Sequence, residues 1–416
     1  MIAMLDNSGV SQAAKRLKDI AHVTPLTLSE RYSELSGAEV YFKREDLQVV
    51  RSYKIRGAYN KMSSLNEEER ARGVICASAG NHAQGVALSC QRLHIKGSIY
   101  MPMPTPKQKL DKVKMFGQNA VEVVIVGDTY DDAYQAALLD AERTGSVFVH
   151  PFDDEKVIEG QATVGLEILR QCKEPIDYVI LPVGGGGLAA GVSQYLAKHS
   201  PSTKVIGVEP CGAASMSAAF EEKKVVSLNT IDTFVDGAAV RRVGTHNFPL
   251  CQRYLAEMRT VHEGQICQTI LDLYNKDAIV IEPAGALSVA ALCEAGDTFK
   301  GKRVVCILSG SNNDMSRSAE IEERALLHAG LKHYFIINFA QRAGALREFV
   351  VEILSPTDNI THFEYTKKSN RVKATAIVGL ELSSPKHLAP LIARMKERGF
   401  FLDYLNENEP LFRVLV

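Results

Sequence analysis

Features that mark several other classes of protein are missing from this chain. Its 416 residues carry a formal net charge of only -1, so the sequence gives no basic footprint for nucleic acid or for an anionic membrane. No apolar run approaches the length of a membrane span, and the first residues lack the basic stretch and apolar core of a secretion signal. We therefore expect a cytoplasmic globular protein with no nucleic-acid partner and no membrane segment.

The cysteines and glycines also lack familiar arrangements. The eight cysteines include no CxxC pair and no cluster with histidine at zinc spacing. We therefore predict no metal site and interpret them as reduced, mostly buried apolar residues. Neither the GxxxxGK(S/T) loop nor the spacing of the GxGxxG dinucleotide fingerprint is present, so a nucleotide ligand is not indicated.

A run of four glycines is the first positive signal. It follows an apolar strand at 179–183 and precedes a predicted helix, and it comprises Gly184, Gly185, Gly186 and Gly187. Consecutive glycines are entropically unfavourable, but they let backbone N–H groups approach an anion near the positive end of a helix dipole. Because a strand and a helix flank the run closely, a phosphate-binding loop is favoured over a merely flexible turn.

A single lysine is the second signal. Lys54 lies in the run 52–58, between the charged segment 43–47 and the glycine-bearing loop 78–82. Lysine loses its proton readily when it is desolvated or close to another cation, which suits it to form a Schiff base and then act as a base. Taken alone, a lysine beside an Arg-Gly turn is more typical of a solvated surface charge, so this interpretation depends on the other segments.

Polar residues follow two further predicted strands. Ser309 ends the strand at 304–308, and the loop after the strand at 74–77 reads Ser78, Ala79, Gly80, Asn81 and His82. Polar groups at the carboxyl ends of parallel strands point into the ligand crevice of α/β sheets. The alternative for Ser309 is an ordinary cap or turn. We expect only a positioning role for His82.

Together these segments resemble the pyridoxal-phosphate enzymes of the tryptophan-synthase-β fold group, known as fold type II, and within it the threonine dehydratases. The resemblance covers about residues 15–330. The segments that carry it are, in order, residues 24–26, 43–47, 52–58, 78–85, 236–238, 282–286 and 309–310.

The resemblance implies a role for each candidate residue. Lys54 carries pyridoxal 5'-phosphate as a Schiff base, Asn81 bonds the ring hydroxyl of this cofactor, and Ser309 faces its pyridine nitrogen. The cofactor phosphate is held by Gly184, Gly185, Gly186, Gly187 and Leu188. The substrate carboxylate is held by Ser78, Ala79, Gly80, Asn81 and His82.

The implied reaction is the dehydration and deamination of L-threonine to 2-oxobutanoate and ammonia, and of L-serine to pyruvate. The amine of Lys54 removes the α-proton, which the cofactor makes acidic. A serine at the pyridine nitrogen, in place of a carboxylate, leaves that nitrogen largely unprotonated. This favours prompt loss of the β-hydroxyl over transamination.

The fold expectation is an α/β catalytic part at residues 1–330. Short β-branched runs alternate with helical stretches, which favours parallel sheets covered by helices on both faces. By resemblance we expect two doubly wound lobes, the smaller at about 47–150 inserted in the larger, with the cofactor between them. Examples of these runs lie at 74–77, 98–101, 121–126, 179–183, 205–208 and 304–308.

The pattern changes after Asn313, where a charged helix at 318–328 ends near Gly330. Residues 331–416 then predict a βαββαβ order, the ferredoxin-like α+β unit. Its predicted elements are a strand from 333, a helix to 354, strands at 360–367 and 372–382, a helix at 386–398 and a strand from 400.

This C-terminal unit resembles the regulatory ACT-like domain of biosynthetic threonine dehydratases, although Ala343 stands where many relatives have proline. The resemblance implies a short-form enzyme with one such domain, regulated by isoleucine or valine, in the first step of isoleucine biosynthesis. The alternative is a domain that only makes subunit contacts. We favour a homotetramer.

Three other functions fit this sequence less well. A serine racemase needs a serine base where this chain has Ala79. A catabolic threonine or serine dehydratase shares the catalytic residues but not the long C-terminal extension. A non-catalytic amino-acid sensor would not need all the site residues together. Related enzymes bind a divalent cation between a Glu-Pro segment and an acidic residue six positions on, where this chain has Glu209 and Ser215.

Overall fold

The computed structural model describes residues 7–365 and 373–415. The chain divides into two compact units, Met1–Met315 and Ser316–Val416. Within the described residues, no helix is long and apolar enough to cross a membrane.

The first unit contains a six-stranded sheet in the order β1-β2-β10-β7-β8-β9. Only the pair β1 and β2 is antiparallel. The strands are β1 (Leu26–Leu28), β2 (Glu39–Arg44), β7 (Tyr178–Pro182), β8 (Lys204–Pro210), β9 (Glu257–Val261) and β10 (Arg303–Leu308). Continuous apolar runs within β7 and β10 suit strands that are buried on both faces.

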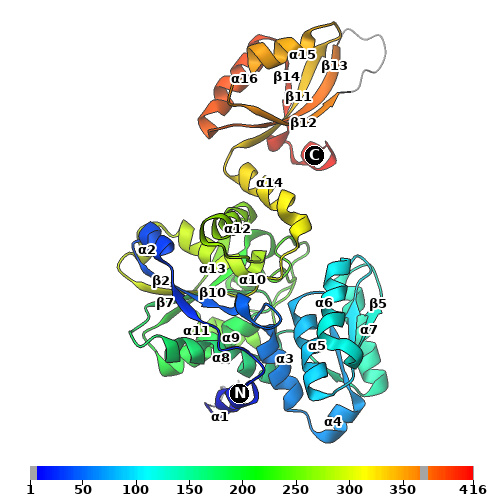
Figure 1. Cartoon of the computed structure of the whole chain (residues 1–416), viewed down its shortest axis with the longest axis vertical. Helices are drawn as coiled ribbons and strands as arrows, with labels where there is room; N and C mark the ends of the chain where they lie inside the picture. Colours follow the sequence, from blue (N-terminus) through cyan, green and yellow to red (C-terminus); the bar gives the residue numbers. More distant parts are fainter. Residues whose placement is uncertain (1–6, 366–372, 416) are drawn as a thin grey trace. The chain divides into compact units, whose positions relative to one another are not determined.

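Helices cover both faces of this sheet, with α8 and α9 on one side and α12 and α13 on the other (Figure 1). The core beneath α8 and α9 is formed by apolar side chains of these helices, of β7 and of α11. The helices of this lobe are α1 (Asn7–Arg16), α2 (Glu30–Ser36), α8 (Glu155–Gln171), α9 (Gly187–His199), α10 (Ser215–Glu222), α11 (Asn247–Tyr254), α12 (Glu263–Asp277) and α13 (Pro283–Glu294).

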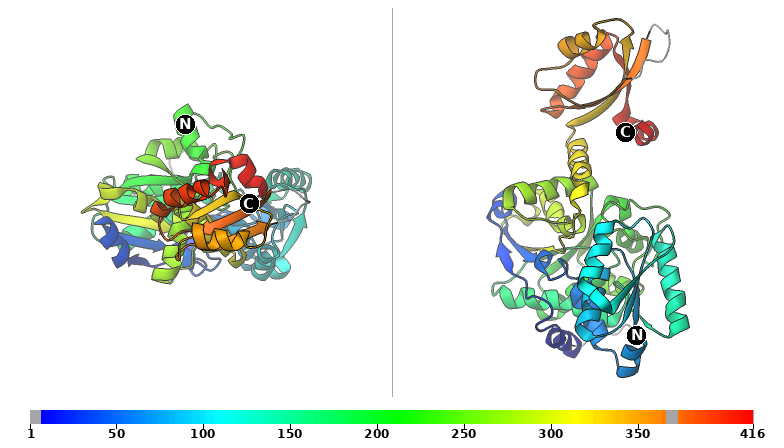
Figure 2. Two further views of the ribbon diagram at one scale, coloured as in Figure 1. Left: turned by 90° about the horizontal axis from the view of Figure 1, so that it is seen from above. Right: turned by 45° about the vertical axis from the view of Figure 1, so that its right-hand side comes forward.

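A smaller parallel sheet in the order β5-β4-β3-β6 forms the second lobe of this unit (Figure 2). Its strands are β3 (Val74–Ala77), β4 (Gly97–Met101), β5 (Val121–Ile125) and β6 (Val147–Phe148). One apolar cluster joins the sheet to α5 and α6, and another joins it to α7. The helices are α3 (Lys54–Ser63), α4 (Glu67–Arg72), α5 (Asn81–Leu93), α6 (Lys107–Gly117) and α7 (Tyr130–Thr144). The prediction of two doubly wound lobes is confirmed.

The second unit has an antiparallel sheet in the order β12-β13-β11-β14. Its strands are β11 (Lys332–Ala340), β12 (Asn359–Tyr365), β13 (Lys373–Glu381) and β14 (Phe401–Tyr404). Its helices are α14 (Ser318–His328), α15 (Ala345–Glu348), continued by a π-helix at Phe349–Ile353, α16 (Leu388–Glu397) and α17 (Glu409–Leu415). The buried core joins the sheet to the helices that follow β11 and precede β14. The predicted ferredoxin-like order is therefore confirmed.

Helix α3 is packed closely between α5 and α8 because glycines take the place of side chains at the contacts. A Cβ atom at Gly160 of α8 would lie 2.5 Å from the carbonyl oxygen of Arg56. A Cβ atom at Gly85 of α5 would lie 3.2 Å from the backbone of Lys54. The backbone of α3 is thus fixed against both neighbouring helices.

A buried ionic cluster also fixes α3. The guanidinium of Arg56 is 1% exposed and lies 2.7 Å from Glu45 and 2.6 Å from Glu167. Lys43 lies 2.6 Å from the second oxygen of Glu167 and donates to the carbonyl of Thr24 at 2.7 Å. Burial acts to raise the pKa of Glu45, but the charge and hydrogen bonds of Arg56, together with Lys43 and Thr24, outweigh it and hold the pKa below its usual value. Two cations and two carboxylates therefore neutralise one another in the interior.

We predict that Arg56→Met destabilises the protein by about 3 to 5 kcal/mol, because it leaves buried carboxylates without their partner. Arg303→Met, which removes a partly exposed pair with Glu39, is the matched control and should cost about 1 kcal/mol or less. Urea unfolding midpoints measure both. Equal small losses would show that the cluster does not fix α3.

Candidate functional site

Lys54 is the first residue of α3 and is partly buried. Its Nζ donates a hydrogen bond to the carbonyl of Pro151 at 2.9 Å. Burial lowers the pKa of Lys54 to about 8, and the Glu282 carboxylate opposes this shift. A lysine with this pKa can lose its proton near neutral pH, which a nucleophilic or basic amine requires.

Ser309 lies beside the start of α3, at the carboxyl end of β10. Its carbonyl accepts a hydrogen bond from the backbone of Tyr53 at 3.2 Å, and Gly310 forms an antiparallel bridge with Ser52. The residue is 2% exposed. The strand end and the lysine, 255 positions apart in the sequence, are therefore adjacent through direct backbone contact.

The loop from Ser78 to Asn81 joins β3 to α5. The hydroxyl of Ser78 accepts a hydrogen bond from the N–H of Gly80 at 3.2 Å, and this segment is partly exposed while the strand before it is buried. The first N–H groups of a helix have no partner within the helix. The loop can therefore present donors to an anion at the positive end of α5.

His82 points away from this loop. Its ring is buried, and Nε2 lies 2.8 Å from the carbonyl of Val149. Burial, followed by the charge of Lys54, lowers the pKa of His82 to about 3. The ring is therefore neutral at pH 7 and donates its Nε2–H to that carbonyl, so its side chain holds α5 in place.

The four glycines form a rigid loop between β7 and α9. Gly186 has φ of +93°, a backbone conformation that strongly favours glycine. A Cβ atom at Gly185 would collide with the ring of Phe152. Asn247 donates to the carbonyl of Gly185 at 2.8 Å and to that of Phe152 at 3.1 Å. These contacts hold the loop in one conformation, and backbone N–H groups at the start of a helix such as α9 can bind an anion.

Leu188 can contribute only its backbone to this cradle. It lies in the first turn of α9, and its side chain is 2% exposed within the apolar core of the larger lobe. The N–H group in the first helical turn is the part of the residue that can face an anion.

Two polar residues of this region had no assigned role in the sequence-based prediction. Glu282 precedes α13 and accepts hydrogen bonds from the amide of Asn81 at 2.6 Å and from the backbone N–H of Asn312 at 3.0 Å. The amide of Asn312 in turn donates to Asn81 at 2.7 Å. Two sequence signals could have identified Glu282. It directly precedes a proline that opens a helix, and it belongs to the segment 282–286 that carries the resemblance.

Glu282 has an unusual electrostatic environment. Burial raises its pKa to about 7, and the charge of Asp236 adds to the increase. Hydrogen bonds from Asn81 and Asn312 oppose it, as does the charge of Lys109. The carboxylate is thus near its titration point at neutral pH.

Glu209 is occupied by protein donors. Its oxygens accept hydrogen bonds from the N–H groups of Met216 at 2.6 Å and Ser217 at 2.8 Å, and also from the Ser217 hydroxyl at 2.8 Å. Burial raises the pKa of Glu209 to about 7. Within the described ranges 7–365 and 373–415, no group of three or more His, Cys, Asp or Glu residues is placed to hold a metal ion.

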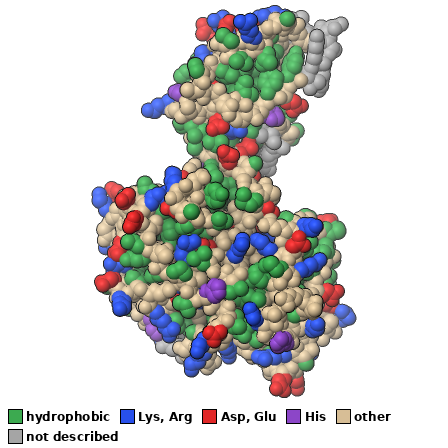
Figure 3. Space-filling model, in the orientation of Figure 1, with side chains coloured by type: hydrophobic (Ala, Val, Ile, Leu, Met, Phe, Trp, Pro, Cys, Tyr) green, Lys and Arg blue, Asp and Glu red, His purple; other side chains and the backbone are tan. Residues whose placement is uncertain are grey.

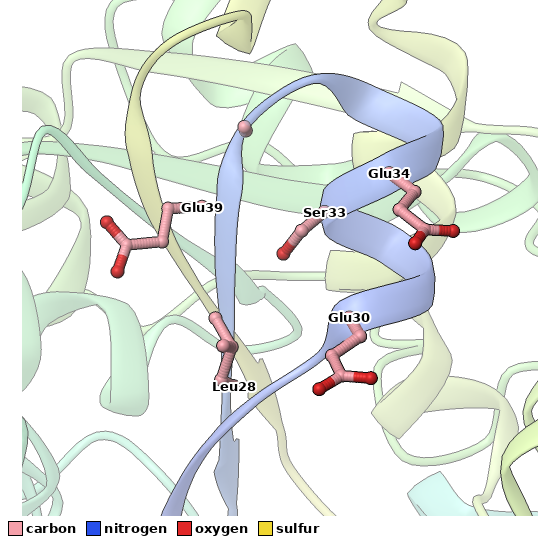
Figure 4. Close-up of a pocket in the computed structure, with 6 residues that line it drawn as sticks. Leu28, Glu30, Ser33, Glu34 and Glu39 are labelled. Carbon is pink, nitrogen blue, oxygen red and sulfur yellow. The ribbon is translucent and has the colours of Figure 1, made fainter.

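A hollow of about 320 Å³ lies beside β1, α2 and the amino end of β2 (Figure 4). It is lined by Glu30, Glu34 and Glu39, and Figure 4 shows the Glu39 carboxylate directed away from the other two. Glu39 pairs with Arg303 at the amino end of β10. Ser309 therefore lies about 20 Å away along the strand, and the hollow is separate from the lysine site.

Two family descriptions match the chain. "Pyridoxal-phosphate dependent enzyme" matches residues 17–310, and "C-terminal regulatory domain of Threonine dehydratase" matches residues 323–415. The first match alone spans more than half of the chain.

Individual relatives agree with these families. The chain is 51% identical to a biosynthetic L-threonine dehydratase of Halalkalibacterium halodurans, and the match covers 97% of each chain. It is 49% identical to a biosynthetic L-threonine dehydratase of Bacillus subtilis, and that match covers 98% of this chain and 96% of the relative. A solved structure, the processed form of threonine deaminase isoform 2 from Solanum lycopersicum, has a TM-score of 0.72 at 44% identity, covering 77% of this chain and 94% of that one. This chain belongs to the biosynthetic threonine dehydratases within the pyridoxal-phosphate-dependent enzymes.

Proposed function

We propose that this chain dehydrates and deaminates L-threonine to 2-oxobutanoate and ammonia, and L-serine to pyruvate, as the first step of isoleucine biosynthesis. The observation that carries the proposal is Lys54, a partly buried amine with a pKa of about 8 beside the end of β10. The identity of about 50% to biosynthetic L-threonine dehydratases over nearly the whole chain supports the same reaction.

The residues fit pyridoxal 5'-phosphate. The glycine loop packs so closely against Phe152, Met216 and Ala238 that side chains would not fit, and it lies at the positive end of α9, where a phosphate would be stabilised. Lys54 supplies the amine for attachment, Asn81 supplies an amide N–H for the ring oxygen, and Ser309 supplies an uncharged hydroxyl for the ring nitrogen. When bound, the cofactor supplies an electron sink that makes the α-proton of the substrate acidic.

The chain's own groups then have separate tasks. The backbone N–H groups from Ser78 to His82 bind and orient the substrate carboxylate at the start of α5. Lys54 Nζ, once free, accepts the α-proton, and its lowered pKa makes the neutral amine accessible near pH 7. The Ser309 hydroxyl adds no charge beside the ring nitrogen, which favours loss of the β-hydroxyl over side reactions.

Racemisation is disfavoured by the residue at position 79. Ala79 has no hydroxyl that could return a proton to the opposite face of the substrate, so Lys54 is the base that acts at the α-carbon. A sensor without catalytic activity would show neither threonine turnover nor the visible absorbance of bound pyridoxal phosphate. These two measurements separate it from the enzyme.

We further propose that residues 1–330 form the catalytic part and that residues 331–416 form a regulatory domain that binds isoleucine or valine. The match of residues 323–415 to the regulatory domain of threonine dehydratase supports this assignment. Isoleucine would inhibit by favouring a less active arrangement, and a coupling of about 1 to 3 kcal/mol changes an affinity about 5- to 150-fold.

We favour a cytoplasmic homotetramer. Several large apolar side chains of the C-terminal unit are exposed, among them Val351 at 69% and Leu402 at 49%. Figure 3 shows apolar side chains gathered on the face of this unit that is in view. Contiguous exposed apolar surface is typical of subunit contacts. Sedimentation of the purified protein tests the tetramer.

Lys54→Ala should reduce threonine turnover by at least about a thousandfold, because it removes both the attachment point and the base. Steady-state formation of 2-oxobutanoate measures it, and the visible spectrum reports the lost attachment. Lys61→Ala is the matched control, since Lys61 lies on the same helix in a partly exposed pair with Asp154 and should leave turnover unchanged. Substantial turnover by Lys54→Ala would rule out the assignment.

Gly185→Ala should weaken the binding of pyridoxal phosphate roughly ten- to a hundredfold, because its methyl group would displace Phe152 and distort the cradle. Gly165→Ala within α8 is the control. Its Cβ would meet only an ordinary contact at 3.4 Å, so the cofactor affinity should stay the same. Titration of the apoenzyme, followed by absorbance, compares the two variants. Equal affinities would show that the phosphate binds elsewhere.

A chain ending at Gly330 should turn over threonine but lose its response to isoleucine. The first unit has its own apolar cores, so it should remain folded without the C-terminal residues. Rates are measured with and without isoleucine for both lengths. Inhibition of the short chain as strong as that of the full chain would place the effector site in the catalytic part.

A further inference from the structure

The carboxylate of Glu282 lies in a space where the neighbouring residues are glycines and have no side chains. A Cβ atom at Gly310 would lie 2.5 Å from Glu282 Oε1, and one at Gly237 would lie 3.3 Å from the same oxygen. Although Glu282 is the cap residue of α13, its side chain makes no capping hydrogen bond to that helix. The carboxylate is therefore directed across the site rather than used to terminate its own helix.

The two oxygens of this carboxylate have different partners. Oε1 accepts from the amide of Asn81 at 2.6 Å, and Oε2 accepts from the backbone N–H of Asn312 at 3.0 Å. Both partners are donors, so an acceptor-only ionised carboxylate satisfies both. An amide side chain would leave one donor facing another donor, and protonation of the carboxylate would weaken it as an acceptor.

The amide of Asn312 is held in one orientation. Its Nδ2 donates to Asn81 Oδ1 at 2.7 Å and to the carbonyl of Val50 at 2.8 Å, while its Oδ1 accepts from Lys112 at 3.2 Å. A flip of this amide would place its oxygen against two acceptors. The Asn81 oxygen is therefore fixed against Asn312, and the Asn81 nitrogen is fixed against Glu282.

This arrangement leaves one hydrogen on the Asn81 amide nitrogen for a ligand. An amide that was free to flip could present its carbonyl oxygen instead and would repel an anionic ring oxygen. We propose that Glu282 is a positioning residue, which together with Asn312 locks the Asn81 amide so that its N–H faces the ring oxygen of the cofactor. The proposal rests on the role assigned to Asn81 in the proposed function.

Charged groups on several elements face Glu282. Lys54 lies at the start of α3, Lys109 and Lys112 lie on α6, and Asp236 lies in the loop after α10. The three lysines favour the ionised carboxylate, whereas burial and Asp236 oppose it. The cations therefore limit the increase in the pKa of Glu282 that burial and Asp236 cause.

The test replaces Glu282 by glutamine in the full-length holoenzyme. Glu282→Gln should weaken the binding of pyridoxal phosphate roughly ten- to a hundredfold and shift the visible absorbance maximum of the bound cofactor. In a background of Asn81→Ala, the same substitution should cause no further loss of affinity, because Glu282 acts through Asn81. A purely structural role would give equal losses in both backgrounds and would contradict the proposal.

Glu263→Gln is the matched control. Glu263 is also buried at the start of a helix, and its carboxylate accepts the backbone N–H of Gly212 at 2.7 Å, in the segment that follows β8. Its substitution should leave the cofactor affinity and spectrum unchanged. If Glu282→Gln does not fold, Asn312→Ala removes the donor to Asn81 Oδ1 and should weaken the cofactor and shift its spectrum in the same direction.

The outcomes for this proposal and for the proposed function are separate. If the parent protein binds no pyridoxal phosphate, the proposed function is wrong. If the parent binds the cofactor, while Glu282→Gln or its substitute Asn312→Ala leaves both affinity and spectrum unchanged, the proposed function stands and the positioning role of Glu282 is wrong.

Discussion

A guanidinium buried between two carboxylates holds the helix that begins at Lys54. Arg56 joins Glu45, which follows β2, to Glu167 on α8. Lys43 donates a hydrogen bond to the same Glu167 carboxylate. Charges removed from water are tolerated only when they are paired with good geometry, so each element has little freedom to shift without breaking the cluster. Because Lys54 lies two positions before Arg56 on the same helix, its backbone position is fixed as well.

The rest of the site is formed by the ends of strands and helices that meet around this helix. The end of β10 contacts the residue before Lys54, the loop before α5 reaches Glu282, and Phe152 packs on the glycine loop. Each of these segments lies where a strand ends or a helix begins, and such places leave backbone donors without partners. A lysine with a lowered pKa, together with the starts of α5 and α9, would suit an anionic cofactor and an anionic substrate.

Much of the architecture could be predicted from the sequence, because buried parallel strands have distinctive apolar runs. The runs at 74–77 and 304–308 coincide closely with β3 and β10, and the βαββαβ order of the C-terminal unit was also predicted correctly. The strand β2 was not predicted, since its charged residues Lys43 and Arg44 obscure the apolar pattern and find partners only in the folded chain. The contact between Glu282 and Asn81 was also not predicted. The two residues are 201 positions apart, and only the folded chain brings them together.

The central claim is that the fold presents Lys54, and no other lysine, to the cofactor. Borohydride reduction of the holoenzyme, followed by peptide mapping, measures this directly, because it makes the bond between pyridoxal phosphate and its lysine permanent. A single labelled peptide, with the modification on Lys54, is expected. A label on Lys43, Lys109 or Lys112, or no label in a protein that turns over threonine, would contradict it.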